Sequence, residues 1–275
     1  MNQNLSTAER LLYSTVKITS LSQGEPIGTG TAFYTNFNET ADSVQPVLIT
    51  NKHVVSGADQ ILITCHISEQ DIYKPSGKLI DFTISLQNRL INHPDEDIDL
   101  CAISIGPLIQ QSIEQNMPIF HAPITMELIP DEEDWQYFDA IENITMVGCP
   151  RGLLDIVNNL PIIRQGITAT SPSKNYNGKK EFMIDMACFP GSSGSPIFLY
   201  NENGYLDRKS QTYPIGKTRL KLLGILHEGP TVTNSGNIIL TKGFQFEVSS
   251  MMHLGVAIKS TELKVLESHL SKIVE

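Results

Sequence analysis

The sequence predicts an all-β protein with a short helix at each end. Apolar runs of strand length recur along most of its 275 residues, separated by Gly, Pro, Asn and Asp. The clearest helix signals stand at the two ends of the chain. The length also exceeds the ~150 residues typical of one domain, which favours two packed halves.

Residues 1–106 form the first predicted unit. Ser6 and Glu9 have the spacing of a capping box, which opens a helix through Tyr13. The strands expected after this helix cover residues 16–19, 30–34, 46–50, 60–67, 80–87 and 100–105.

Residues 107–143 are predicted to connect the two units. Within them, the stretch 127–142 holds seven acidic residues and no basic one. Such a charge run usually forms a solvated connection, and the alternative is a docking surface for a basic partner.

The second predicted unit, 144–259, is followed by a helix over 260–275. Its polar loop 201–221 carries five basic residues, and we expect this loop to be exposed. Ser260 can cap the last helix, in which four apolar residues recur at helical spacing: Leu263, Leu266, Leu270 and Ile273. This stripe is expected to pack on the second unit, and a docking helix for a partner is the alternative.

A run of small residues at 191–196 provides the best candidate for a nucleophile. Gly/Ser runs often form turns without chemistry, but strand-like segments flank this one on both sides. A tight turn between strands can expose a serine hydroxyl and direct backbone N–H groups at an oxyanion. Ser193 fits this description best. An α/β-hydrolase elbow is disfavoured, because it needs Gly at position 195 and a helix afterwards.

The base and the orienting carboxylate are sought upstream of Ser193. Among seven histidines, none is flanked like His53, which follows the strand-like run 46–50 and precedes Val54 and Val55. The alternative is a purely structural histidine. Asp99 immediately precedes the apolar run 100–105, so a rigid element would hold its carboxylate. Asp95 and Asp97 lie nearby, with Asp97 as the second candidate, and all three could instead be solvated loop charges.

Six short stretches, taken together, resemble one known family. They are 28–33 (GTGTAF), 48–55 (LITNKHVV), 99–103 (DLCAI), 147–152 (VGCPRG), 191–196 (GSSGSP) and 254–258 (LGVAI). In content and order they resemble a chymotrypsin-fold, trypsin-like serine peptidase, and the Deg or high-temperature-requirement type is the most similar. The resemblance covers most of the chain.

The resemblance implies two packed six-stranded antiparallel β-barrels with a catalytic triad between them. Ser193 would be the nucleophile, His53 the general base and then acid, and Asp99 the orienting carboxylate. The backbone N–H groups of Gly191 and Ser193 would form the oxyanion hole. No cofactor and no metal are expected.

Three departures from the family pattern are informative. Ser192 stands where trypsin-like zymogens carry an Asp that pairs with a new N-terminus, so that activation route is excluded. Ser195 replaces a glycine of the family motif. The short segment after Ile258 leaves no room for the PDZ domain usual in Deg-type proteins.

The family also implies where the substrate side chain before the cut bond would lie. The predicted pocket residues are Ala187, Phe189, Leu226, His227 and Gly229. Trypsin-like enzymes select Lys or Arg with an acidic residue at the position of Ala187, so a basic preference is disfavoured. An apolar or small side chain is expected, and His227 leaves an acidic one as the alternative.

Composition narrows the partners and the compartment. A net charge of -10 disfavours nucleic-acid binding. No apolar run reaches the ~20 residues of a membrane helix, and the N-terminus does not begin a signal peptide, so no membrane partner and a cytoplasmic location are expected. The four cysteines lack Cys-x-x-Cys spacing, which predicts buried reduced thiols rather than disulfides or zinc ligands.

These observations predict an intracellular serine endopeptidase that hydrolyses protein substrates through an acyl-enzyme. Regulation by an activating partner or effector is compatible with the sequence. The alternative function is a catalytically idle module that binds peptides or protein partners in the same cleft. The co-occurrence of Ser193, His53 and Asp99 favours the enzyme, because a binding module has no chemical need for all three.

Overall fold

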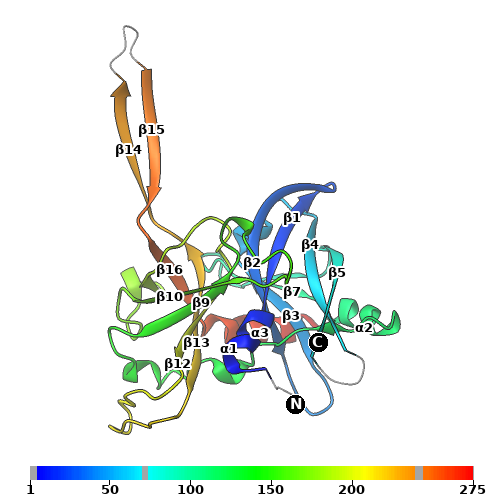
Figure 1. The fold of residues 1–275 in the computed structure, drawn as a ribbon, viewed down its shortest axis with the longest axis horizontal. Helices are drawn as coiled ribbons and strands as arrows, with labels where there is room; N and C mark the ends of the chain where they lie inside the picture. The colour runs from blue at the N-terminus through cyan, green and yellow to red at the C-terminus, as the bar shows by residue number, and fades with distance from the viewer. Residues whose placement is uncertain (1–4, 70–73, 239–243, 275) are drawn as a thin grey trace.

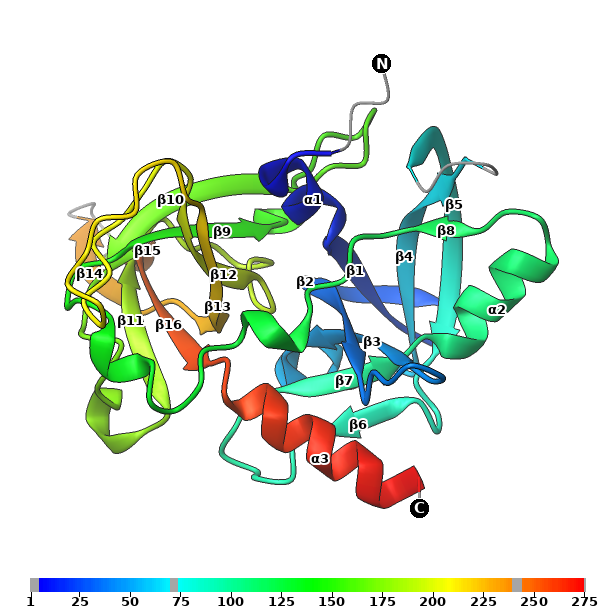
Figure 2. The ribbon, with the colours of Figure 1, turned by 90° about the horizontal axis from the view of Figure 1, so that it is seen from below.

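The computed structural model describes residues 5–69, 74–238 and 244–274. It confirms the predicted fold class: the described residues are mostly β, with an eight-stranded sheet, a closed barrel of six strands, a separate hairpin and three α-helices. The sheet and the barrel lie side by side, as Figures 1 and 2 show. We call these two halves the first sheet and the second barrel.

The first sheet is built from antiparallel strands in the order β5-β4-β1-β2-β3-β7-β6, with β8 paired to β4. Its strands are β1 (Thr15–Ser22), β2 (Glu25–Phe37), β3 (Gln45–Thr50), β4 (Gln60–Ser68), β5 (Pro75–Ser85), β6 (Leu90–Asn92), β7 (Cys101–Ser104) and β8 (Ile119–Phe120). It has eight strands rather than the six expected. The additional strands β6 and β8 are too short to show a periodic pattern in the sequence.

The connection between the halves is more structured than predicted. It contains the helix α2 (Gly106–Glu114) before β8. Its acidic side chains contact basic residues of the polar loop and of the strand that follows it: Asp134 with Lys209, Asp139 with Arg208 and Glu142 with Arg219. Only the Glu142–Arg219 pair, at 2.7 Å, is largely shielded from solvent. Much of the acidic run is therefore balanced within the chain.

The second barrel closes in the order β10-β11-β16-β13-β12-β9. Its strands are β9 (Asn143–Gly148), β10 (Ile162–Thr168), β11 (Glu181–Asp185), β12 (Pro196–Asn201), β13 (Arg219–Glu228) and β16 (Leu254–Lys259). Between β13 and β16, the strands β14 (Thr231–Ile238) and β15 (Phe244–Met251) form a hairpin that the sequence analysis did not predict. Figure 1 shows this hairpin projecting away from the barrel.

The helices at the two ends differ in how well they were predicted. The capping box of α1 (Thr7–Tyr13) is present, since Ser6 Oγ accepts from Glu9 N–H and the Glu9 carboxylate accepts from Ser6 N–H. Ser260 was expected to cap α3 (Glu262–Val274), but its hydroxyl donates to the carbonyl of Leu222.

The packing of α3 corrects a prediction. Its buried leucines do not pack on the second barrel alone. They join a core with Phe33 and Ile49 of the first sheet and Phe198 and Ile258 of the second barrel. Figure 2 shows α3 leaving the barrel and running beneath β6 and β7. The helix therefore joins the two halves that border the site.

Candidate active site

The register of β3 and β7 brings His53 and Asp99 together. Thr50, at the end of β3, pairs with Cys101 at the start of β7. His53 follows β3 in a short 3-10 helix (Lys52–Val55), and Asp99 precedes β7 by two positions. Because the two strands are antiparallel neighbours, the end of one and the start of the other lie at the same edge.

The Asp99 carboxylate contacts both the ring and the backbone of His53. Its Oδ2 lies 2.5 Å from His53 Nδ1, and its Oδ1 accepts from the His53 backbone N–H at 3.1 Å. Asn51 Nδ2 donates to the Asp99 carbonyl at 2.7 Å. A carboxylate only accepts, so the proton lies on Nδ1, and Nε2 of the neutral ring is left as a base.

The serine turn depends on two glycines with positive φ. Gly191 (φ 85°) and Gly194 (φ 87°) adopt a conformation that side-chain-bearing residues rarely take. A Cβ at Gly194 would also overlap the Thr31 carbonyl oxygen of β2. The serine turn is thus packed against the first sheet.

Thr31 links that turn to the first sheet with two hydrogen bonds and makes a third to Cys149. Its N–H donates to the Ser193 carbonyl at 2.9 Å, and its hydroxyl donates to the Gly191 carbonyl at 2.9 Å. The same hydroxyl accepts from Cys149 N–H at 2.9 Å. The sequence analysis assigned Thr31 no role, because its partners lie more than a hundred residues away.

The backbone N–H groups of Gly191 and Ser193 are available for a ligand. Arg151 N–H donates to the Pro190 carbonyl at 2.6 Å, which fixes the Pro190–Gly191 peptide. In a trans peptide the N–H points opposite to the C=O, so the Gly191 N–H points away from Arg151. Among the described residues, neither the Gly191 nor the Ser193 N–H donates to a protein acceptor. This arrangement is what an oxyanion hole requires.

The Ser193 hydroxyl is oriented away from the base. It donates to the His227 carbonyl at 3.3 Å, a long hydrogen bond, and none joins it to His53 within the described chain. Ser193, Gly191 and His53 nevertheless line one cavity of about 280 Å³, together with Gly28 and Thr29 among others. The predicted nucleophile and the predicted base therefore face a common space.

Ser195, which replaces a family glycine, is accommodated by Gly148 of β9. A Cβ added at Gly148 would overlap Ser195 Oγ. Ser192, where zymogens carry Asp, is fully buried, and its hydroxyl has no partner among the described residues. Both serines pack at this turn as small side chains.

The predicted pocket residues lie in different surroundings. Leu226 is buried, and a Cβ at Gly255 would lie 2.7 Å from its Cδ1 and 2.6 Å from Cys188 Sγ. The carbonyl of Ala187 accepts from Arg164 Nη1 at 2.6 Å. The Phe189 ring lies near two guanidinium groups, those of Arg164 and Arg151. Gly229 follows directly after β13 and is half-buried.

His227 points toward the Asp99 carboxylate. Its Nδ1 lies 3.9 Å from Asp99 Oδ2, and its Nε2 lies 3.4 Å from Glu181 Oε1. The pairing of β13 with β16 shifts register between Leu226 and Glu228, so His227 occupies an irregularity of the kind that redirects a side chain. The ring thus lies between two carboxylates from different halves of the molecule.

The cysteines do not compete as nucleophiles. All four are free and buried, as the sequence predicted. Burial raises the pKa of the Cys149 thiol, next to the serine turn, to about 12 and that of Cys188 to about 11. These thiols stay protonated at neutral pH. The described residues contain no group of three or more His, Cys, Asp or Glu arranged for a metal ion.

Comparison with known proteins fits this geometry. Residues 28–206 match the sequence profile of the trypsin-like peptidase domain. The chain belongs to this family. The matched segment contains His53, Asp99 and Ser193, and it ends before β13 begins.

Solved structures resemble the fold of this trypsin-like peptidase at low identity. A thermostable serine protease, AL20, from an extremophilic microorganism has a TM-score of 0.50 and 11% identity over 95% of this chain and 98% of that chain. A serine endoprotease from Yersinia pestis has a TM-score of 0.49 and 17% identity over 96% of this chain and 65% of that chain. The inactive form of a serine-to-alanine mutant from M. tuberculosis H37Rv has a TM-score of 0.46 and 14% identity over 97% of this chain and 88% of that chain. A search of curated proteins found no match.

Proposed function

We propose that this trypsin-like peptidase is an active serine endopeptidase that uses Ser193, His53 and Asp99 as its triad. The observation that carries the proposal is the 2.5 Å contact between His53 Nδ1 and Asp99 Oδ2, because His53 and Ser193 line the same cavity. The uncommitted N–H groups of Gly191 and Ser193 support it further. No cofactor is part of the proposed reaction.

The proposed reaction begins when the Ser193 hydroxyl leaves the His227 carbonyl and turns toward His53. Its oxygen bonds to the scissile carbonyl carbon while its proton passes to His53 Nε2, and the oxyanion accepts from Gly191 and Ser193 N–H. Asp99 stabilises the imidazolium. His53 then protonates the leaving amine as the C–N bond breaks, and water hydrolyses the acyl-enzyme by the same route.

For the substrate, we propose a small or apolar residue before the cut bond. Support comes from Ala187, which places no carboxylate where trypsin-like enzymes select Lys or Arg, and whose carbonyl accepts from the Arg164 guanidinium. A basic side chain would therefore find no counter-ion at this position. The position of His227, between Asp99 and Glu181, weakens the alternative of an acidic preference through this residue.

The compartment and regulation are also part of the proposal. Four buried free thiols favour the reducing cytosol. Within the described residues, no helix has the length and apolarity needed to cross a bilayer. The net charge of -10 disfavours nucleic acid as a partner, which leaves proteins and peptides as the substrates and regulators to test.

A second candidate, a catalytically idle peptide-binding module, has one observation in its favour. The Ser193 hydroxyl bonds the His227 carbonyl rather than His53. Catalytic hydrogen bonds are often long in ligand-free sites and form in the substrate complex, so this geometry also suits the enzyme.

A library of fluorogenic peptides distinguishes the two functions. We expect wild-type protein to hydrolyse members with small or apolar residues before the cut bond, and His53→Gln to lose this activity. Peptide binding without hydrolysis, equal for wild type and His53→Gln, would instead establish the binding module. The same assay with candidate protein partners tests whether activity needs an activator.

A further inference from the structure

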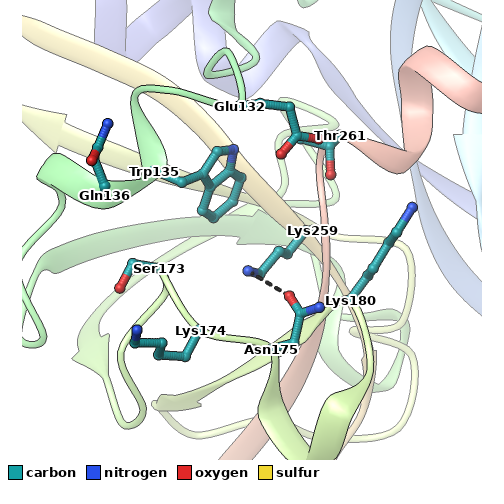
Figure 3. Close-up of a pocket in the computed structure, with 9 residues that line it drawn as sticks. All are labelled: Glu132, Trp135, Gln136, Ser173, Lys174, Asn175, Lys180, Lys259 and Thr261. Atoms are coloured by element: carbon teal, nitrogen blue, oxygen red, sulfur yellow. Dashed lines mark hydrogen bonds between the residues drawn. The ribbon is translucent and has the colours of Figure 1, made fainter.

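A second cavity, of about 380 Å³, lies at the end of the second barrel. It is bordered by the connection (Glu132, Trp135, Gln136), the β10–β11 loop and the start of β11 (Ser173, Lys174, Asn175, Lys180), and the β16–α3 junction (Lys259, Thr261). Figure 3 shows these side chains around the cavity. None of them belongs to the proposed triad or its oxyanion hole.

Lys259 is the unusual member of this lining. It is only 7% exposed, although lysine is almost never buried without a charged partner. Its ammonium donates to Asn175 Oδ1 at 2.9 Å and lies 4.9 Å from the centre of the Trp135 ring. Figure 3 shows the ammonium between these two groups.

The ammonium of Lys259 lacks a counter-ion. Among the described residues, no carboxylate lies within ion-pair distance of it. Burial lowers the pKa of Lys259, and the charge of Glu132 acts in the opposite direction. An ammonium has three donors, and one hydrogen bond with one aromatic face leaves it incompletely satisfied.

A further observation points to an anion beside Lys259. Lys174 and Lys180 border the same cavity, and only Lys180 has a carboxylate partner, Glu262 at 2.8 Å. The cavity lining therefore holds three lysines and one acid, Glu132, whereas the chain as a whole has a net charge of -10.

We propose that this cavity binds a phosphate-class oxyanion, with Lys259 as its principal partner. Lys174 extends the donor set, and Glu132 at the rim limits the charge that the site tolerates. A cavity of about 380 Å³ has room for roughly a dozen water molecules, so a phosphate fits with space for a small organic group. The group that the site would bind is the phosphate, either as a free ion or as part of a monoester.

Trp135 is the only tryptophan of the chain, which gives the site its own optical probe. The test is a fluorescence titration of the full chain with inorganic phosphate, and separately with glycerol phosphate, at constant ionic strength. We expect a saturable change in Trp135 emission with at least one of them. Tighter binding of glycerol phosphate would identify a monoester site, and tighter binding of inorganic phosphate a free-phosphate site. This readout does not depend on peptidase activity.

Matched lysine variants decide whether the signal belongs to the site. Lys259→Met removes the ammonium with little change in volume and should weaken binding by about tenfold or more, the loss of one charge-assisted hydrogen bond. Lys264→Met removes a lysine that pairs with Asp131 outside the cavity and should bind as wild type. Lys174→Met, at an exposed position, tests the site independently should Lys259→Met not fold, and it should weaken binding severalfold. Absence of saturation in wild type, or equal affinity in the Lys174 and Lys264 variants, would overturn the proposal.

Discussion

The two halves of the active site are prepared to different degrees. On the side of the first sheet, the contact of His53 with Asp99 is complete, with the carboxylate held by backbone and side-chain hydrogen bonds. On the side of the second barrel, the backbone of the serine turn is fixed, but the Ser193 hydroxyl points to the His227 carbonyl. The pairing of strands sets the first arrangement, whereas the proposed reaction needs the Ser193 hydroxyl to leave the His227 carbonyl.

The largest expected effect is that of removing the nucleophile. Ser193→Ala should lower kcat by about 10⁶ and leave the fold intact, because triad members act as a unit. Ser192→Ala is the matched control, since that buried hydroxyl has no hydrogen-bond partner among the described residues and should be dispensable. Peptide hydrolysis and circular dichroism on both variants measure this. Unchanged hydrolysis by Ser193→Ala would remove the serine from the mechanism.

Asp99 tests the prepared half of the site. Asp99→Asn should lower kcat by about 10⁴, because the amide no longer holds the His53 tautomer with the proton on Nδ1. Asp97→Asn, at an exposed position two residues away, should change activity little. The measurement is kcat for both variants, and a larger loss in Asp97→Asn would transfer the orienting role to that residue.

Thr31 tests whether the first sheet fixes the serine turn. Thr31→Val removes the hydroxyl bonds to Gly191 and Cys149 and should lower kcat/KM by up to about 10², the effect of a small misplacement of catalytic groups. Thr31→Ser keeps the hydroxyl and should recover most of the loss. If valine and serine behave alike, the hydroxyl does not position the oxyanion hole.

Gly148 and Ser195 form a pair that packs behind the turn. Gly148→Ala should lower the free energy of unfolding by about 1–3 kcal/mol, because its Cβ would overlap Ser195 Oγ. The double variant Gly148→Ala/Ser195→Gly should recover much of this loss. Urea unfolding of the single and double variants measures the coupling, and strictly additive effects would show that the two residues do not share this space.

The smallest effect expected is a loss of stability on acidification. Burial lowers the pKa of His66, His93 and His121 in the folded protein. The unfolded chain therefore binds these protons more readily, and the free energy of unfolding should fall as pH drops below about 6.5. His93→Gln removes one of these three histidines, so it should reduce the dependence of the free energy of unfolding on pH. Urea midpoints at several pH values for both proteins provide the test, and identical slopes would exclude His93.

The parts of the site that adjoin strand ends could be predicted from the sequence. His53, Asp99 and Ser193 each stand next to an apolar run, so local pattern alone singled them out. The capping box at Ser6 and the fold class were accessible for the same reason, since both rest on short-range spacing.

The remaining features depend on contacts between distant segments. Thr31 meets Gly191 across 160 residues, and no local signal marks it. The direction of His227 follows from a register shift in β13, which the sequence does not reveal. The apolar stripe of α3 was visible, but the side of the molecule that it covers was not, because amphipathic spacing does not specify a partner.

The central claim is that the two halves act together on a substrate, and labelling of Ser193 by a fluorophosphonate tests it most directly. The reagent bonds covalently only to a serine that a working base and oxyanion hole activate. The account predicts phosphonylation at Ser193, identified by peptide mass, in wild type and in Ser192→Ala, and its loss in His53→Gln. Absence of label in folded wild-type protein, with and without candidate partners, or equal labelling of His53→Gln, would contradict it.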